Sequence, residues 1–175
     1  MEITYNQKEP ASWQQTAEAI GALTEEFGDK MLFGAGTVTS VELTHAHGGK
    51  YIISPDTNVD VIKCTRELGM VSLPGAMTPT EVLTAHAAGA DFVKVFPIGD
   101  LGVGYLKAIR APISHVKLMA VGGVNESNAA DFLRAGAVGL GIGGNFAKKA
   151  WTDAGEFDKL TEAAKTMVEI IKSVQ

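Results

Sequence analysis

The sequence predicts an α/β fold of the (β/α)8 TIM-barrel class, and three observations support this prediction. Strand-like and helix-like segments alternate along the whole chain, as in a parallel sheet covered by helices. A unit of glycine, strand, breaker and helix recurs after Gly49, Gly69 and Gly89, and its opening returns at Gly136. Seven strands can be counted with short connections, and seven of eight strands indicates a barrel.

The composition is that of a packed globular protein. The chain has 175 residues, of which 46% are hydrophobic and 20% charged, so we expect one partial barrel domain over residues 1–175. A net charge of −5 argues against a nucleic-acid partner or a membrane-surface role. No apolar run approaches the roughly 20 residues of a membrane span. Cys64 is the single cysteine, which fits a reducing cytoplasm.

Period-2 alternation and breakers predict the elements of the first half. The expected strands are Glu2–Tyr5, Met31–Phe33, Tyr51–Ser54 and Met70–Leu73, with Gly34–Thr37 as a turn. The expected helices cover residues 12–27, 39–48, 58–68 and 78–89, each followed or ended by glycine. Capping patterns open three of these helices, at Ser12, Thr39 and Thr78.

The second half continues the same alternation. The expected strands are Asp91–Ile98, Val116–Val121 and Val138–Ile142. The expected helices are Tyr105–Arg110, a helix capped by Asn125 that closes at Gly136, and Phe157–Val174. A flat doubly wound sheet is the rival fold. No Gly-x-Gly-x-x-Gly motif opens a helix after the first strand, which counts against a Rossmann domain.

Lys94 stands in the middle of an apolar strand. Phe92, Lys94 and Phe96 share one face, and Val93 and Val95 suit the face toward the helices, so Lys94 is expected inside the barrel. A desolvated lysine has a lowered pKa and becomes a nucleophile, which favours Schiff-base chemistry. The alternative is a structural lysine whose stem packs while its head reaches water.

Glycine pairs follow the last two strands, at Gly122-Gly123 and Gly143-Gly144. Barrels commonly bind phosphate at these positions, because backbone N–H groups approach an anion closely there. The alternative is that both pairs are tight turns. Two pairs at corresponding strand ends favour the phosphate site.

A Schiff-base enzyme also needs a proton shuttle, and Glu2 is the best candidate. The alternative for Glu2 is a solvated charge at a chain end. Thr37 could hydrogen-bond a carboxylate or a carbonyl, or it could be a turn residue. No metal site is expected, because the histidines show no grouping typical of metal ligands: His45, His47, His86 and His115.

Five motifs resemble the 2-keto-3-deoxy-6-phosphogluconate (KDPG) / 4-hydroxy-2-oxoglutarate aldolase family. In chain order they are Gly34-Ala-Gly-Thr-Val38, Ile53-Ser-Pro55, Leu73-Pro-Gly75, Phe92-Val-Lys-Val-Phe-Pro97 and Val121-Gly-Gly-Val124. The resemblance covers nearly the whole chain. It implies a class I aldolase, a carbon–carbon lyase of carbohydrate metabolism that works as a homotrimer without a cofactor.

The resemblance also implies roles for individual residues. Lys94 would form the imine with pyruvate, and Glu2 would transfer protons. Thr37, Pro74 and Phe96 would line the pyruvate end of the site. The glycines of both pairs would bind the phosphate: Gly122, Gly123, Gly143 and Gly144. The substrates would be a 2-keto-3-deoxy-6-phospho sugar acid, or pyruvate and glyceraldehyde 3-phosphate in reverse, with 4-hydroxy-2-oxoglutarate as a further possibility.

Three departures from the family pattern matter. Asn6 stands where many members have arginine, and Val121 where a threonine is common; members resembling 6-phosphogalactonate aldolases share these features. The stereochemistry of the sugar acid therefore stays open. The resemblance also implies that the first strand and helix of the family barrel precede residue 1, so we expect a fragment or a start site assigned too late. Two alternatives remain: another phosphate-binding barrel, such as an epimerase or isomerase, and a non-catalytic truncated barrel.

Overall fold

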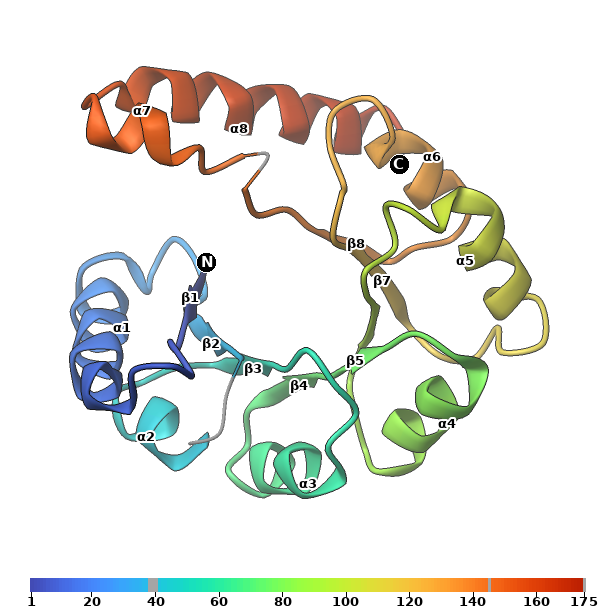
Figure 1. Ribbon diagram of the computed structural model, residues 1–175, viewed down its shortest axis with the longest axis horizontal. Coiled ribbons are helices and arrows are strands. Elements are labelled where there is room, and N and C mark those ends of the chain that lie inside the picture. The colour runs from blue at the N-terminus through green and yellow to red at the C-terminus, as the bar shows by residue number, and fades with distance from the viewer. Residues whose placement is uncertain (38–40, 145, 175) are drawn as a thin grey trace. The chain divides into compact units, whose positions relative to one another are not determined.

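The structure is a computed structural model that describes residues 1–37, 41–144 and 146–174. The chain divides into two compact units, Met1–Val93 and Lys94–Gln175. Each unit alternates short strands with helices (Figure 1). The expectation of one domain over residues 1–175 stays a prediction.

Four strands of the first unit form a parallel sheet in the order β1-β2-β3-β4. They are β1 (Glu2–Thr4), β2 (Gly34–Gly36), β3 (Tyr51–Ile53) and β4 (Val71–Leu73). The register pairs Glu2 with Gly34, Gly34 with Tyr51, and Tyr51 with Val71. Residues paired in this way point to the same face of a parallel sheet, so these four form one row across it.

The helices of the first unit lie along one side of its strands (Figure 1). They are η1 (Pro10–Ser12), α1 (Trp13–Phe27), α2 (Val41–Ala46), α3 (Val59–Glu67) and α4 (Pro79–Ala87). A buried cluster joins Tyr5 and Ile52 to Ile20 of α1. Glu2 and Thr4 are exposed, because β1 alternates and turns them to the opposite face from Tyr5.

The second unit contains the strand that carries Lys94. Strand β6 (Val93–Val95) begins at the boundary between the units and lies beside β7 (Leu118–Val121), which pairs in parallel with β8 (Gly139–Gly141). The helices are α5 (Gly102–Arg110), α6 (Ala129–Arg134), α7 (Lys149–Asp153) and α8 (Phe157–Lys172). Leu106, Leu118 and Phe132 are among its most deeply buried side chains.

The strand predicted at Met31–Phe33 is wrong, because the paired residues are Gly34–Gly36 instead. Glycine weakens an isolated strand, since it loses the most backbone freedom on ordering. Here a side chain at position 34 would overlap Tyr51, and one at position 36 would overlap Glu2. This steric requirement for glycine outweighs the low intrinsic preference of glycine for strands. The sequence also missed the short elements β5 (Gly75–Ala76) and α7, and α5 begins at Gly102 rather than at Tyr105.

Two of the predicted helix caps form no capping hydrogen bond, although Ser12 is the N-cap residue of α1. The Ser12 hydroxyl donates to the Glu9 carbonyl at 2.8 Å and makes no capping bond to α1. The Asn125 side chain accepts from Ser127 N at 2.9 Å and so forms a local turn, and α6 begins only after Asn128. Short polar side chains satisfy turns as readily as helix ends, which explains both errors. Thr39 lies outside the described residues.

The predicted cap at Thr78 is confirmed. Its hydroxyl accepts from Glu81 N, and the Glu81 carboxylate accepts in return from Thr78 N at 2.7 Å, a complete capping box.

In the part of the chain that the structure describes, no helix combines the length and apolar character of a membrane span.

Candidate active site

The carboxylate of Glu2 lies over Gly36 in the first unit. A Cβ atom added to Gly36 would overlap the carboxylate and stand 2.5 Å from its Cδ atom. Thr4, two residues along the same strand face, donates to Glu2 Oε1 at 3.4 Å. Glycine at position 36 therefore creates the space that the Glu2 side chain occupies.

The ring of Tyr51 lies over Gly34, one step along the same face of β2. A Cβ atom added to Gly34 would stand 2.5 Å from Tyr51 Cδ2 and 2.6 Å from Cγ. Burial raises the pKa of the Tyr51 phenol to about 12, and the negative charge of Glu2 adds to this effect. The two side chains thus lie close enough to influence each other electrostatically.

Thr37 follows Gly36 with φ of 56°, the left-handed region that β-branched residues seldom adopt. Its N–H donates to the Ile53 carbonyl at 2.9 Å, and its carbonyl accepts from the Gln7 side chain. Two hydrogen bonds thus hold a strained residue directly after β2. Strain of this kind concentrates at functional sites.

Pro74 is buried between β4 and β5. The next residue, Gly75, accepts a hydrogen bond from Thr57 Oγ1 at 2.7 Å. Glu2, Thr37 and Pro74 are the candidate site residues of the first unit. Glu2 belongs to β1, Thr37 follows β2, and Pro74 follows β4.

Lys94 is buried in the second unit, with 8% of its surface exposed, between the fully buried Val93 and Val95. Its Nζ atom lies 4.8 Å from the centroid of the Phe96 ring, a cation–π distance. The predicted alternation is therefore confirmed, because Lys94 and Phe96 share one face and the valines the other.

The first glycine pair lies against the end of the lysine strand. Gly122 and Gly123 have φ values of 86° and 78°. A Cβ atom on Gly122 would stand 3.0 Å from the Phe96 ring, and one on Gly123 would stand 2.8 Å from Gly99 Cα. Gly99 N also donates to the Gly122 carbonyl at 2.7 Å. Contacts with Phe96 and Gly99, together with the positive φ values, therefore explain why both residues of this tight turn are glycines.

The second glycine pair is different. No described atom lies within 4 Å of a Cβ atom added to Gly143 or Gly144, apart from their chain neighbours. The Gly143 carbonyl accepts from Phe146 N at 2.8 Å, which turns the chain here. Contacts within the described chain therefore do not explain why these two residues are glycines.

A cavity of about 320 Å³ lies beside this second turn. Ile142, Phe146 and Met167 give it apolar walls, and Lys148 and Glu126 bring opposite charges to it. Asn125 and Ser127 line it from the turn before α6.

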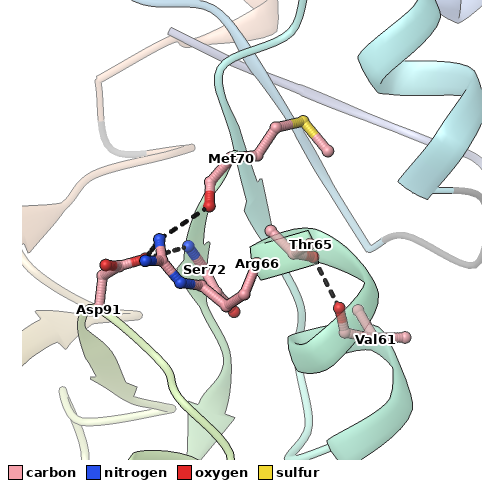
Figure 2. Close-up of polar contacts among 6 residues, drawn as sticks. All are labelled: Val61, Thr65, Arg66, Met70, Ser72 and Asp91. Atoms are coloured by element: carbon pink, nitrogen blue, oxygen red, sulfur yellow. Dashed lines mark hydrogen bonds and ion pairs between the residues drawn. The ribbon is translucent and has the colours of Figure 1, made fainter. Parts of the chain in front are cut away.

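An ion pair stands at the start of the lysine strand (Figure 2). Arg66 Nη1 donates to Asp91 Oδ2 at 2.7 Å and to the Met70 carbonyl at 3.1 Å, and Ser72 N donates to the same Asp91 oxygen at 2.9 Å. Asp91 is thereby fixed to the end of α3 and to β4. This network holds the chain two residues before β6 begins.

The first unit brings Glu2 over Gly36, directly before Thr37, and the second unit brings Phe96 next to both Lys94 and Gly122. Sequence reasoning missed Tyr51, Gly34 and Gly36 as members of the site. The signal was available: two glycines at i and i+2 in a strand clear one face for large neighbours. Within residues 1–37, 41–144 and 146–174, no three histidine, cysteine or carboxylate side chains form a metal-binding group.

Comparison with known proteins identifies relatives of this chain. The chain is 38% identical over 138 residues to the 2-dehydro-3-deoxy-6-phosphogalactonate aldolase of Escherichia coli, which covers 77% of this chain and 67% of that protein. It is 42% identical over 121 residues to a probable aldolase of the same name from Rhizobium meliloti, covering 67% of this chain and 57% of that protein.

A solved structure described as "Native KDPGal structure" matches 99% of this chain and 93% of that chain, with a TM-score of 0.84 and 27% identity. This match and the alternation of parallel strands with helices confirm the predicted α/β fold of the TIM-barrel class. A sequence model of the family described as "Aldolase: KDPG and KHG aldolase" matches residues 1–163. The predicted resemblance is confirmed, and the chain belongs to the KDPG and KHG aldolase family, whose members are lyases.

Proposed function

We propose that this protein is a class I aldolase that cleaves a 2-keto-3-deoxy-6-phospho sugar acid to pyruvate and glyceraldehyde 3-phosphate. The observation that carries the proposal is the burial of Lys94 in a strand of apolar residues, with its Nζ atom beside the Phe96 ring. A buried amine at such a strand end is suited to attack a ketone. No cofactor takes part in the proposed chemistry.

Lys94 begins the reaction as a nucleophile. Its neutral amine adds to the C2 ketone of the sugar acid, and loss of water gives a protonated imine. The C3–C4 bond then breaks, and its electron pair forms the C2–C3 double bond of an enamine. The electron pair of the former carbon–nitrogen double bond moves to the nitrogen.

Glu2 carries the protons, through a water molecule. Its carboxylate accepts the proton of the C4 hydroxyl, and the released O–H electron pair forms the aldehyde of glyceraldehyde 3-phosphate. The proton then goes to the enamine carbon C3, which restores the imine. Water hydrolyses the imine, and pyruvate and the free Lys94 amine result.

Thr37, Pro74 and Phe96 line the pyruvate end of the proposed site. Gly122, Gly123, Gly143 and Gly144 form its phosphate end. Support for the second pair is that both glycines are open to close approach by a ligand, because no contact within the described chain requires them. The cavity beside them brings Lys148 as a positive charge.

The substrate is a gluconate- or galactonate-derived sugar acid. The names of the two reported bacterial relatives favour the galactonate form, and the family description includes KDPG and KHG. Parallel kcat/KM measurements with both phosphorylated sugar acids and with 4-hydroxy-2-oxoglutarate decide among these substrates. We also expect a cytoplasmic homotrimer. Light scattering after gel filtration measures the molar mass and so tests the trimeric state.

Borohydride reduction in the presence of pyruvate tests the chemistry. The expected result is a mass increase by one reduced pyruvate on the peptide that contains Lys94. Lys94→Met provides the matched control, since it keeps an unbranched apolar side chain and lacks the amine. A folded wild-type protein without the adduct would rule out the Schiff-base mechanism and leave the two alternatives, another phosphate-binding barrel enzyme and a non-catalytic barrel.

A further inference from the structure

We infer that Tyr51 is a positioning residue for Glu2, because its ring lies over Gly34 and the Glu2 carboxylate lies over Gly36, on the same face of the first sheet. This inference rests on the proposed function, in which Glu2 transfers protons. It assigns a role to a residue that the motifs of the sequence did not indicate.

The strand register brings the two residues together. Glu2 pairs with Gly34, and Gly34 pairs with Tyr51, so both side chains rise from the same row of the sheet. Neighbouring strands lie about 4.8 Å apart, which places the two Cα atoms roughly 10 Å from each other. Side chains as long as glutamate and tyrosine reach across this interval when the residue between them has no side chain.

Gly34 and Gly36 make this arrangement possible. The Tyr51 ring fills the position where a side chain at 34 would stand, and the Glu2 carboxylate fills the position at 36. The two glycines share one face, because they are two residues apart in a strand. The ring therefore forms a wall on one side of the carboxylate, and Thr4 binds Glu2 Oε1 on the same face.

A carboxylate that transfers protons must stay within hydrogen-bonding reach of the reacting atoms. Glutamate has three rotatable bonds, and an exposed one samples many rotamers. The Tyr51 ring removes some of these rotamers before substrate binds. The Tyr51 phenol is neutral at neutral pH, and burial and the charge of Glu2 raise its pKa further, so the ring adds no negative charge beside Glu2.

The test separates imine formation from proton transfer. Wild type, Tyr51→Leu, Tyr51→Met and Tyr51→Phe are each incubated with pyruvate in D2O. Borohydride trapping measures the imine on Lys94, and NMR measures exchange of the methyl protons of pyruvate, which requires the base. Glu2→Gln serves as the reference for loss of the base. Val71→Ala serves as the matched control, since Val71 continues the same row beyond Tyr51.

Loss of the ring should slow methyl exchange about tenfold or more in Tyr51→Leu and Tyr51→Met, because a small misplacement of a catalytic group is costly. Trapping and the KM for pyruvate should stay within about twofold, and Tyr51→Phe should retain most of the exchange. If Tyr51→Leu does not fold, Tyr51→Met provides the measurement of methyl exchange without the ring.

The outcomes distinguish the two claims. Exchange at the wild-type rate in the folded ring-deleting variants, with normal trapping, overturns the role of Tyr51 alone. Exchange that persists in Glu2→Gln overturns the role of Glu2 and this inference with it. Absence of trapping in the wild type overturns the proposed function itself.

Discussion

Asp91 and Arg66 form an ion pair of 2.7 Å, and Asp91 lies three residues before Lys94. The same Asp91 oxygen accepts the backbone N–H of Ser72, so one carboxylate joins α3, β4 and the entry to β6. A half-exposed ion pair alone contributes little, but a charged group that also satisfies a backbone donor contributes more.

Asp91→Ala should lower the free energy of unfolding by about 2 kcal/mol, because Ser72 N loses its charged acceptor. Urea denaturation measures the change. Asp153→Ala is the control, since Asp153 forms an exposed i,i+4 pair with Lys149 and should change stability by less than about 0.5 kcal/mol. Equal losses in both variants would show that the Asp91 network has no special role.

Gly36→Ala should abolish most of the methyl exchange with pyruvate, because the added Cβ atom would displace the Glu2 carboxylate. Lys94 should still form the imine, so trapping with borohydride should persist in the folded variant. Circular dichroism provides the check on folding. If the variant is folded and exchanges at the wild-type rate, the carboxylate above Gly36 is not the working base.

Gly144→Ala should leave the free energy of unfolding within about 0.5 kcal/mol of the wild type, since the added methyl meets open space. It should raise the KM for the phosphorylated substrate, because the methyl group occupies the approach to the proposed phosphate. Gly123→Ala is the contrasting variant. Its positive φ and the nearby Gly99 Cα should make it less stable by about 2 kcal/mol. An unchanged KM in Gly144→Ala would argue against a phosphate site at the second turn.

Thr78→Ala should destabilise the protein by about 1 kcal/mol, because the hydroxyl caps α4. Ser12→Ala removes a similar hydroxyl before α1, where no capping bond exists, and should cost less than about 0.5 kcal/mol. Thermal denaturation of both variants gives the comparison. Hydrogen bonds from Met77 N and Thr78 N lower the pKa of Glu81. The stabilisation by the Glu81 carboxylate is therefore present at neutral pH and is lost as the pH falls through the folded-state pKa of Glu81.

Tyr51 should titrate at alkaline pH, with a phenol pKa of about 12 against an ordinary value of 10.0. Because the folded state favours the neutral phenol, its contribution to stability is complete below the unfolded pKa. It is lost as the pH rises through the folded pKa. Ultraviolet difference spectra of wild type and Tyr51→Phe isolate this titration. Ionisation of Tyr51 near its ordinary pKa would contradict the burial of the ring beside Glu2.

Several elements could be predicted because their cause is local. The alternation of Phe92 to Phe96 places Lys94 opposite the valines, and the Thr78 capping box closes within four residues. Periodicity and local hydrogen bonds depend on neighbours along the chain, so the sequence contains this information directly. The same pattern at Ser12 failed, because its hydroxyl found a nearer partner at Glu9.

By itself, the sequence determined the alternation of strands and helices, the face of Lys94 in its strand, and the motifs of the family. Only the tertiary structure decided that Gly34–Gly36 is a strand, that Tyr51 lies beside Glu2, and that Asp91 is held by Arg66. These features pair residues that are far apart in the chain. Their energies depend on which side chains fill the space across the sheet, and no short window of sequence contains that information.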